Sequence, residues 1–169
     1  MSRTNTTFGL LQAIAAIAAF AILLWSIGLP SFRFAEAASV TSLSDTLSDS
    51  APAVGSDHTI NFVTPTGVPS GQTIVIDFSE GPFVVGSVDF TDIDVFDEST
   101  SLTVGADCTT TETSAVFSGT TLTITMCSGT AIPASGTTTI MIGENAAGGN
   151  AQLTNPSVGS YEINLTVGA

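Results

Sequence analysis

Apolar and polar residues alternate with a period of two through most of the chain after residue 57. Successive side chains of a strand point to opposite faces, so this alternation predicts strands that each bury one face. Clusters of Gly, Pro, Ser and Asn between the alternating segments predict turns. The strands expected from the pattern are 58–64, 73–78, 87–95, 102–108, 114–117, 121–126, 138–142 and 161–167, with a less regular segment at 40–47.

A set of seven to eight short strands of this kind predicts an all-β domain in which antiparallel sheets pack face to face as a β-sandwich. Each strand has an apolar face that has to meet a second layer. A partly open barrel would produce the same alternation and stays an alternative. The inward-facing residues change parity between Phe90 and Ile93, where a β-bulge would restore the register.

The chain before this domain has a different character. An apolar segment runs from Leu10 to Pro30 with only Gln12 and Ser26 as polar interruptions. Residues 10–30 are long enough to cross a hydrocarbon core of about 30 Å as one continuous helix. The Ala-Glu-Ala sequence at 35–37 has the pattern of a signal-peptide cleavage site. The segment is therefore expected to be a signal peptide cut after residue 37, or an uncleaved N-terminal anchor, and both predict export of the rest.

We expect three parts: residues 1–37 as signal peptide or membrane anchor, 38–56 as an N-terminal strand with a flexible linker, and 57–169 as the β-sandwich domain. Arg3 and Arg33 are the only Arg or Lys residues, whereas all Asp and Glu residues except Glu36 follow residue 37. A body of such negative charge repels phosphate groups. This excludes nucleic acid as a partner and anionic membranes as a docking surface.

The chain contains two cysteines, Cys108 and Cys127. An even number of cysteines in an exported domain predicts a disulfide, which would stabilise the fold by about 3 kcal/mol through lost chain entropy. A zinc site needs about four ligands, and His58 is the only further nitrogen or sulfur candidate. A reactive thiolate needs a nearby cation, and again only His58 is available. We therefore expect a structural bond.

Residues 89–98, DFTDIDVFDE, carry five carboxylates. Ca²⁺ takes about 6–8 oxygen ligands, and Asp94, Asp97 and Glu98 at the strand end are the residues that could converge on one ion. The segment lacks the glycine and the terminal glutamate of an EF-hand loop. Charges on an edge strand also prevent unwanted pairing, so a solvated acidic edge is the other interpretation.

The residue inventory argues against an enzyme. A Ser-His-Asp arrangement has only His58 to serve as base, and its place at a strand start predicts a surface or half-buried residue. A glycosidase pairs carboxylates across a cleft, usually with aromatic residues for the sugar, but the chain after residue 37 has one Tyr and no Trp. We expect no catalytic residues and no cofactor except, in the calcium hypothesis, Ca²⁺.

Several segments resemble the immunoglobulin-like modules of bacterial and archaeal cell-surface proteins. They are SDTL (44–47), HTINF (58–62), PTGVPSGQTIVIDF (65–78) and GSYEINLTV (159–167). The resemblance covers most of residues 38–167. It implies an immunoglobulin-like antiparallel β-sandwich, preceded here by the N-terminal hydrophobic helix, with a structural or adhesive role outside the cell.

Three functions are thereby predicted. The first is a non-catalytic cell-surface structural or adhesion module, released or held by residues 10–30, with other surface proteins or copies of itself as partners. The second is a subunit of an extracellular filament, in which residues 38–50 leave their own domain and complete a neighbour's sheet. The third is a calcium-dependent binding module that depends on Asp94, Asp97 and Glu98.

Overall fold

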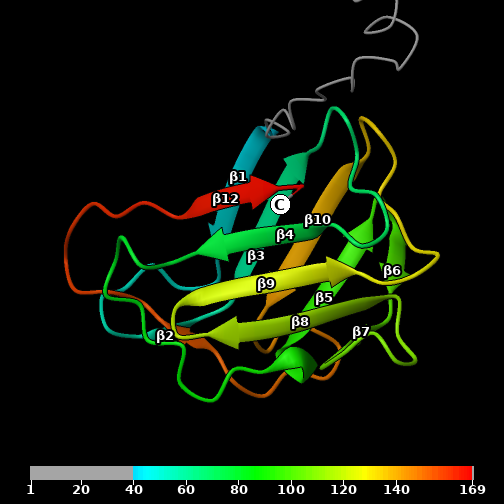
Figure 1. Cartoon of the computed structure of the whole chain (residues 1–169). Coiled ribbons are helices and arrows are strands. Elements are labelled where there is room, and N and C mark those ends of the chain that lie inside the picture. The colour runs from blue at the N-terminus through cyan, green and yellow to red at the C-terminus, as the bar shows by residue number, and fades with distance from the viewer. Residues whose placement is uncertain (1–39, 169) are drawn as a thin grey trace, which may run out of the picture. The chain divides into compact units, whose positions relative to one another are not determined.

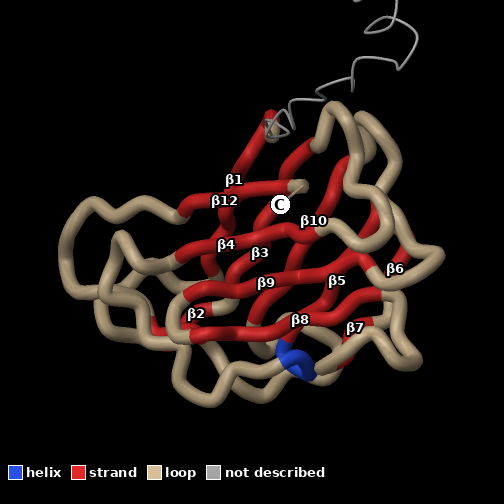
Figure 2. The backbone as a smooth tube through the Cα atoms, in the orientation of Figure 1, coloured by secondary structure: helices blue, strands red, loops and turns tan. Residues whose placement is uncertain are grey.

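The computed structural model describes residues 40–168, which form an all-β structure with one short 3-10 helix (Figures 1 and 2). The expected helix at 10–30 and the possible cleavage site after residue 37 lie outside the described residues. The elements are β1 (Thr41–Leu47), β2 (Gly55–Ser56), β3 (His58–Val63), β4 (Thr73–Asp77), η1 (Phe90–Asp92), β5 (Ile93–Asp97), β6 (Thr100–Leu102), β7 (Val104–Gly105), β8 (Thr113–Ser118), β9 (Thr121–Met126), β10 (Thr137–Ile142), β11 (Leu153–Thr154) and β12 (Asn164–Val167).

Two five-stranded sheets make up most of this structure. One has the strand order β1-β3-β10-β5-β6, and the other has the order β12-β4-β9-β8-β7. Figure 1 shows the sheets as two layers whose strands cross obliquely. A small pairing of β11 with β2 lies at one end. Neighbouring strands are antiparallel throughout the two main sheets, except that β7 runs parallel to β8.

The core lies between the two sheets, where the period-two pattern predicted it. Alternate residues of β3, β4, β9 and β10 are buried, while the residues between them keep partial exposure. The largest fully buried side chains include Phe62, Phe78, Ile74, Ile124 and Ile140. The sequence prediction of an all-β fold with two packed layers is confirmed.

The expected bulge between Phe90 and Ile93 is wrong, because the helix η1 occupies this place. Asp89 caps η1 by accepting a hydrogen bond from the Thr91 N–H at 2.8 Å, and Asp92 accepts one from the Asp89 N–H at 3.0 Å. This reciprocal capping box lets a single helical turn change the direction of the chain. The parity change in the sequence is therefore a helical turn, after which β5 begins at Ile93.

The expected strand at 102–108 is in fact two short strands in different sheets. Leu102 ends β6, which pairs with β5, and Val104 starts β7, which pairs with β8. The chain thus passes from one sheet to the other within this segment. At the other end of the chain, β12 starts at Asn164, later than the expected start at residue 161.

On the β1 and β12 side, each main sheet ends in a strand that pairs with one neighbour among residues 40–168. β1 has seven residues, and all of them are exposed. No β1 side chain belongs to the buried core, whereas Val40 just before it is partly buried and packs against the core. The opposite ends of the two sheets are the three-residue β6 and the two-residue β7, which offer little edge for pairing. Within residues 40–168, no helix is long and apolar enough to cross a membrane.

Candidate functional site

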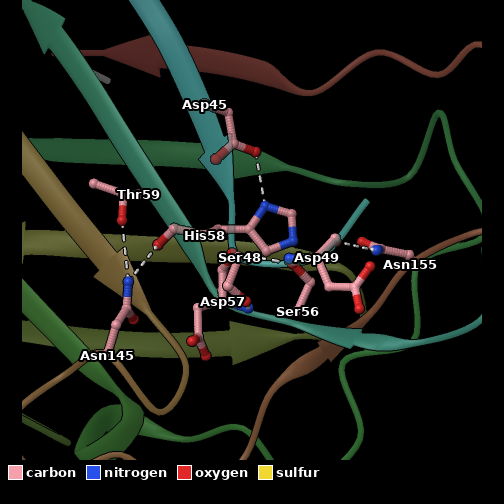
Figure 3. A network of polar contacts seen from close by, with 9 residues as sticks. All are labelled: Asp45, Ser48, Asp49, Ser56, Asp57, His58, Thr59, Asn145 and Asn155. Carbon is pink, nitrogen blue, oxygen red and sulfur yellow. Dashed lines mark hydrogen bonds and ion pairs between the residues drawn. The ribbon is translucent and has the colours of Figure 1, made fainter. Parts of the chain in front are cut away.

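A buried histidine is the most unusual polar residue of the described domain. His58, the first residue of β3, is completely buried, and its Nδ1 lies 2.7 Å from Oδ2 of Asp45 on β1 (Figure 3). The Asp45 side chain keeps 21% of its exposure, so the pair links the core to the surface. This finding corrects the sequence expectation that His58 would be a surface or half-buried residue. Leu47 is directly opposite His58 in the β1–β3 ladder, which brings Asp45 over the ring.

Further polar contacts hold the chain that connects β1 to β3 (Figure 3). The backbone N–H of Asp57 donates to Oγ of Ser48 at 2.9 Å, and the N–H of Asp49 donates to Oγ of Ser56 at 3.2 Å. The side chain of Asn155 donates to the carbonyl oxygens of Asp49 and Ala51 at 2.8 and 3.1 Å. The segment that was expected to be a flexible linker is therefore attached to the loop that follows β11.

The His58 ring packs edge-on against two phenylalanines. Its centroid lies 5.8 Å from that of Phe78 and 5.9 Å from that of Phe83. The second ring nitrogen, Nε2, is buried and has no hydrogen-bond partner among residues 40–168. A histidine that activates a nucleophile holds that nitrogen against a hydroxyl or thiol group. Among the described residues, the His58 ring contacts Asp45 and the two phenylalanine rings, and the contact with Asp45 joins β1 to the core.

A cavity of about 380 Å³ adjoins the His58–Asp45 pair. It lies between the β1 end of one sheet and the loop that leads from β11 into β12. Its volume falls in the range of small-ligand pockets, which is roughly 300–1,000 Å³, and apolar and aromatic groups dominate its wall. The side chains that define its character are Asp45, Leu47, Phe83, Val158, Tyr161 and Ile163.

This cavity reaches the molecular surface. Val158 is 87% exposed and lies at its margin, and Leu47 is 39% exposed. The Tyr161 hydroxyl lies 3.2 Å from Oγ of Ser157, which fixes the turn of this loop. An apolar cavity with exposed apolar margins and a carboxylate in its wall is the most site-like feature of residues 40–168.

The electrostatic environment of the cavity is negative. Residues 40–168 contain no Lys or Arg, so His58 is the only side chain there that can place a positive charge near a carboxylate. Asp45 accepts its hydrogen bond from His58 through Oδ2, and its other oxygen has no protein partner in the described part of the chain. The cavity therefore offers a free hydrogen-bond acceptor beside an apolar wall.

Elsewhere, carboxylates cap turns, and these contacts shift their pKa values. The Ser79 backbone N–H lowers the pKa of Asp77, the Thr91 hydroxyl lowers that of Asp89, and the Thr109 N–H lowers that of Asp107. In contrast, burial raises the pKa of Asp97, and the negative charge of Glu98 raises it further. Hydrogen bonds stabilise the charged form in the first group, while desolvation opposes it at Asp97.

The predicted disulfide is confirmed. Cys108 and Cys127 are bonded with an S–S distance of 2.02 Å, and no free cysteine is found among residues 40–168. The bond connects the loop between β7 and β8 to the residue after β9. It thus closes the end of the β8–β9 hairpin, whose turn is formed at Gly119 with a positive φ of 62°.

The three residues of the calcium hypothesis differ in their surroundings. Asp94 and Asp97 are separated by an odd number of positions on β5, so their side chains leave opposite faces of the sheet. Oδ2 of Asp94 accepts the Ala147 N–H at 2.8 Å, whereas Glu98 is exposed in the turn after β5 with a φ of 53°. No group of three or more metal-ligating side chains is found within residues 40–168. Calcium binding stays a prediction.

Other carboxylates of the acidic segment hold the loop after β10. Asp92 is 1% exposed and accepts backbone N–H groups of Asn150 and Ala151 at 2.7 and 3.0 Å, in addition to that of Asp89. A buried carboxylate needs hydrogen-bond partners, and three backbone N–H groups supply them to Asp92. The high density of acidic residues at 89–98 therefore has a structural explanation in Asp89, Asp92 and Asp94.

The sequence contained a signal for the site that was not recognised. Asp45 and His58 each belong to alternating segments and occupy positions where an apolar residue would fit the pattern, between Leu43 and Leu47 and before Ile60. Two polar residues at inward positions of neighbouring strands indicate a buried pair, provided that the strand pairing is known.

Comparison of the chain with protein families, curated proteins and solved structures finds no match in any of the three.

Proposed function

We propose that this protein is a non-catalytic structural or adhesion module of the cell surface, exported through its apolar segment at 10–30. The observation that carries the proposal is the Cys108–Cys127 disulfide in the all-β body that follows this segment. Disulfides form and persist in oxidising compartments outside the cytosol. A body without Lys or Arg is also kept soluble there by its negative charge.

The finer proposal is that the body is an immunoglobulin-like sandwich. Two antiparallel layers with a core between them, and a chain that crosses between layers near Leu102, support it. Such modules serve as spacers and as binding domains, because their loops and edges vary without loss of the core. In this protein, the β1 edge and the cavity beside it are the features that could contact a partner.

Trypsin treatment of intact producing cells tests export and anchoring together. Because trypsin cuts only after Lys and Arg, its last possible site is Arg33, and the whole body stays intact. An uncleaved anchor with an outward body predicts release of a fragment that starts at Phe34. A cleaved signal peptide predicts a body that starts at Ala38 and is found outside the membrane before trypsin is added.

The matched control is Arg33→Gln, which removes the cutting site without touching the described domain. In the anchored case, trypsin then releases nothing. A body that is protected from trypsin until the cells are lysed, and that is recovered with two free thiols, would contradict the proposed function.

Filament formation by donation of residues 38–50 is a second proposal, and one observation favours it. All seven residues of β1 are exposed, so a β1 strand from a neighbour could replace the resident one without disturbing the core. Every ladder contact with β3 would be recreated between the two copies.

A pair of engineered cysteines separates donation from the home arrangement. Thr46 lies opposite Thr59, so Thr46→Cys with Thr59→Cys should form a bond within one chain if β1 stays at home. Donation predicts covalent multimers instead. The control pair Asn61→Cys with Thr139→Cys links β3 to β10, which remain in one chain in either arrangement. If both cysteine pairs form disulfides within one chain to the same extent in assembled material, donation is ruled out.

A further inference from the structure

We propose that the β1 edge and the adjoining cavity together bind an extended peptide segment of another surface protein, in which an apolar residue stands two positions from an Arg or Lys. The proposal deepens the proposed function. It rests on that function in one respect, which is that the protein meets its partner outside the cell. Three features of the structure carry it: a strand edge that no described residue covers, an apolar cavity beside that edge, and a carboxylate in the cavity wall with one oxygen that accepts no hydrogen bond from the described residues.

The free edge supplies backbone hydrogen bonds. β1 is the terminal strand of its sheet, and with seven residues it is the longest strand of the described domain. Its only partner among residues 40–168 is β3. The register with β3 shifts between Thr41 and Ser44, so residues 44–47 are the regular part of the edge that an added strand would use. An extended peptide that pairs with such an edge gains affinity from its main chain, while pockets for its alternate side chains provide the specificity.

The cavity lies where those side chains would point. Asp45 and Leu47 of β1 are opposite the buried Ile60 and His58, so they face the inner side of the sheet. Both residues line the cavity, together with Tyr161 and Ile163 from the chain that leads into β12. An added strand would project every second side chain into the same space. A volume of about 380 Å³ holds one or two large side chains.

The charge decides which side chains fit. One oxygen of Asp45 pairs with His58, the other has no hydrogen-bond partner among residues 40–168, and these residues contain no Lys or Arg. A carboxylate in an apolar wall favours a ligand that brings its own positive charge and hydrogen-bond donors. Tyr161 adds an aromatic face, which attracts Arg and Lys. An acidic peptide would meet only repulsion.

Charge also disfavours a second copy of the described domain as the occupant. Its residues 40–168 provide carboxylates and no Lys or Arg, so two such edges would bring like charges together. The partner must supply the cation, and a basic strand in another surface protein does so.

The test uses the purified full chain, with its disulfide formed, and two synthetic heptapeptides. The basic peptide is acetyl-Thr-Phe-Thr-Arg-Thr-Val-Thr-amide, in which Phe, Arg and Val share one face of the extended chain, and the acidic peptide has Glu in place of Arg. Binding is followed by the NMR shifts of the backbone amides. The basic peptide should bind at least about tenfold more tightly than the acidic one. The largest shifts should fall on residues 43–47 and 157–163.

Two variants with matched controls locate the contacts. Asp45→Asn should weaken binding of the basic peptide about tenfold, whereas Glu98→Gln, which removes one charge at the far side of the same sheet, should leave it unchanged. Val158→Ser should weaken binding about threefold, and Val116→Ser, at another exposed valine on β8, should not. The valine pair keeps the test valid if Asp45→Asn fails to fold.

A third peptide tests the backbone pairing. N-methylation of alternate residues of the basic peptide removes the donors that pair with a strand edge, and it should abolish binding. Equal binding of the basic and acidic peptides, undiminished binding of the methylated peptide, or largest shifts at residues that neither lie in the two named segments nor line the cavity would overturn the proposal. So would a domain that associates with itself through 43–47 and excludes the peptide. These results do not depend on where the protein resides, so the proposed function is tested separately.

Discussion

The β4–β9 pairing and the β1–β3 pairing are both antiparallel ladders of alternating residues, yet they are stabilised differently. In β4 and β9, the inward residues Ile74, Ile76, Leu122 and Ile124 are fully buried beneath the opposite sheet. In β1, every residue is exposed, and its attachment depends on the backbone ladder and on polar contacts such as Asp45 to His58. Alternating apolar residues are therefore buried only where a second layer covers the strand.

The largest expected effect comes from a core truncation set against an edge truncation. Ile124→Ala should lower the free energy of unfolding by about 2–5 kcal/mol, because it leaves a cavity between the sheets. Leu43→Ala, at a residue that is 46% exposed, should lower it by less than about 1 kcal/mol. Urea unfolding measures both. Similar losses for the two variants would break the distinction between core and edge.

Removal of the disulfide should have the second largest effect on the free energy of unfolding. Replacing Cys108 and Cys127 by Ala together should lower the free energy of unfolding by about 3 kcal/mol, since the bond closes a loop with a sequence separation of 19. Reduction of the wild-type protein should have the same effect, and the reduced double variant serves as the control. Stability that is unchanged in the double variant would mean that the bond plays no part in holding the β8–β9 region.

The polar attachment of β1 should contribute less to the free energy of unfolding than the disulfide does. Asp45→Asn should lower the free energy of unfolding by about 1–3 kcal/mol, because it exchanges a charge-assisted hydrogen bond of a buried ring for a weaker one. In the background of His58→Phe, the same substitution should have little effect. Thermal or urea unfolding of the double-mutant cycle measures the coupling. A coupling near zero would show that β1 is held by its backbone alone.

The pH dependence of stability separates the turn-capping carboxylates from Asp97. The pKa values of Asp77, Asp89 and Asp107 are lowered in the folded protein by hydrogen bonds, so the unfolded chain binds more protons. Their contribution to stability is present above pH of about 4 and is lost as the pH falls through their folded pKa values. Unfolding measured from pH 7 downward should show this loss, and Asn substitutions should reduce it. A flat profile would contradict the assignment.

The contribution of Asp97 to the pH dependence of stability should have the opposite sign and be the smallest of these effects. Burial raises its pKa above the unfolded value, so its ionisation destabilises the fold as the pH rises through that range. Asp97→Asn should therefore be neutral or stabilising at pH 7. Glu98→Gln should lower the pKa of Asp97, because it removes a nearby negative charge. An NMR titration of the Asp97 carboxyl carbon checks this, and an unchanged pKa would exclude the influence of Glu98.

The sequence was most informative where side chains alternate in the covered core. The strands at β3, β4, β9 and β10 and the bond between Cys108 and Cys127 follow from local patterns. The turn at η1 was missed because the capping of Asp89 and Asp92 produces the same parity change as a bulge. The pairing of Asp45 with His58 was missed because it depends on the register of two strands, which local patterns do not determine.

The most direct test of this account is native-state hydrogen exchange of the domain. It measures, amide by amide, the free energy of the opening that allows exchange. We predict that amides in the β4–β9 ladder exchange only by global unfolding, and that amides in the β1–β3 ladder exchange through local openings of much lower free energy. β1 amides protected to the global limit would contradict the central claim, which is that β1 forms an exposed edge on a core that does not depend on it.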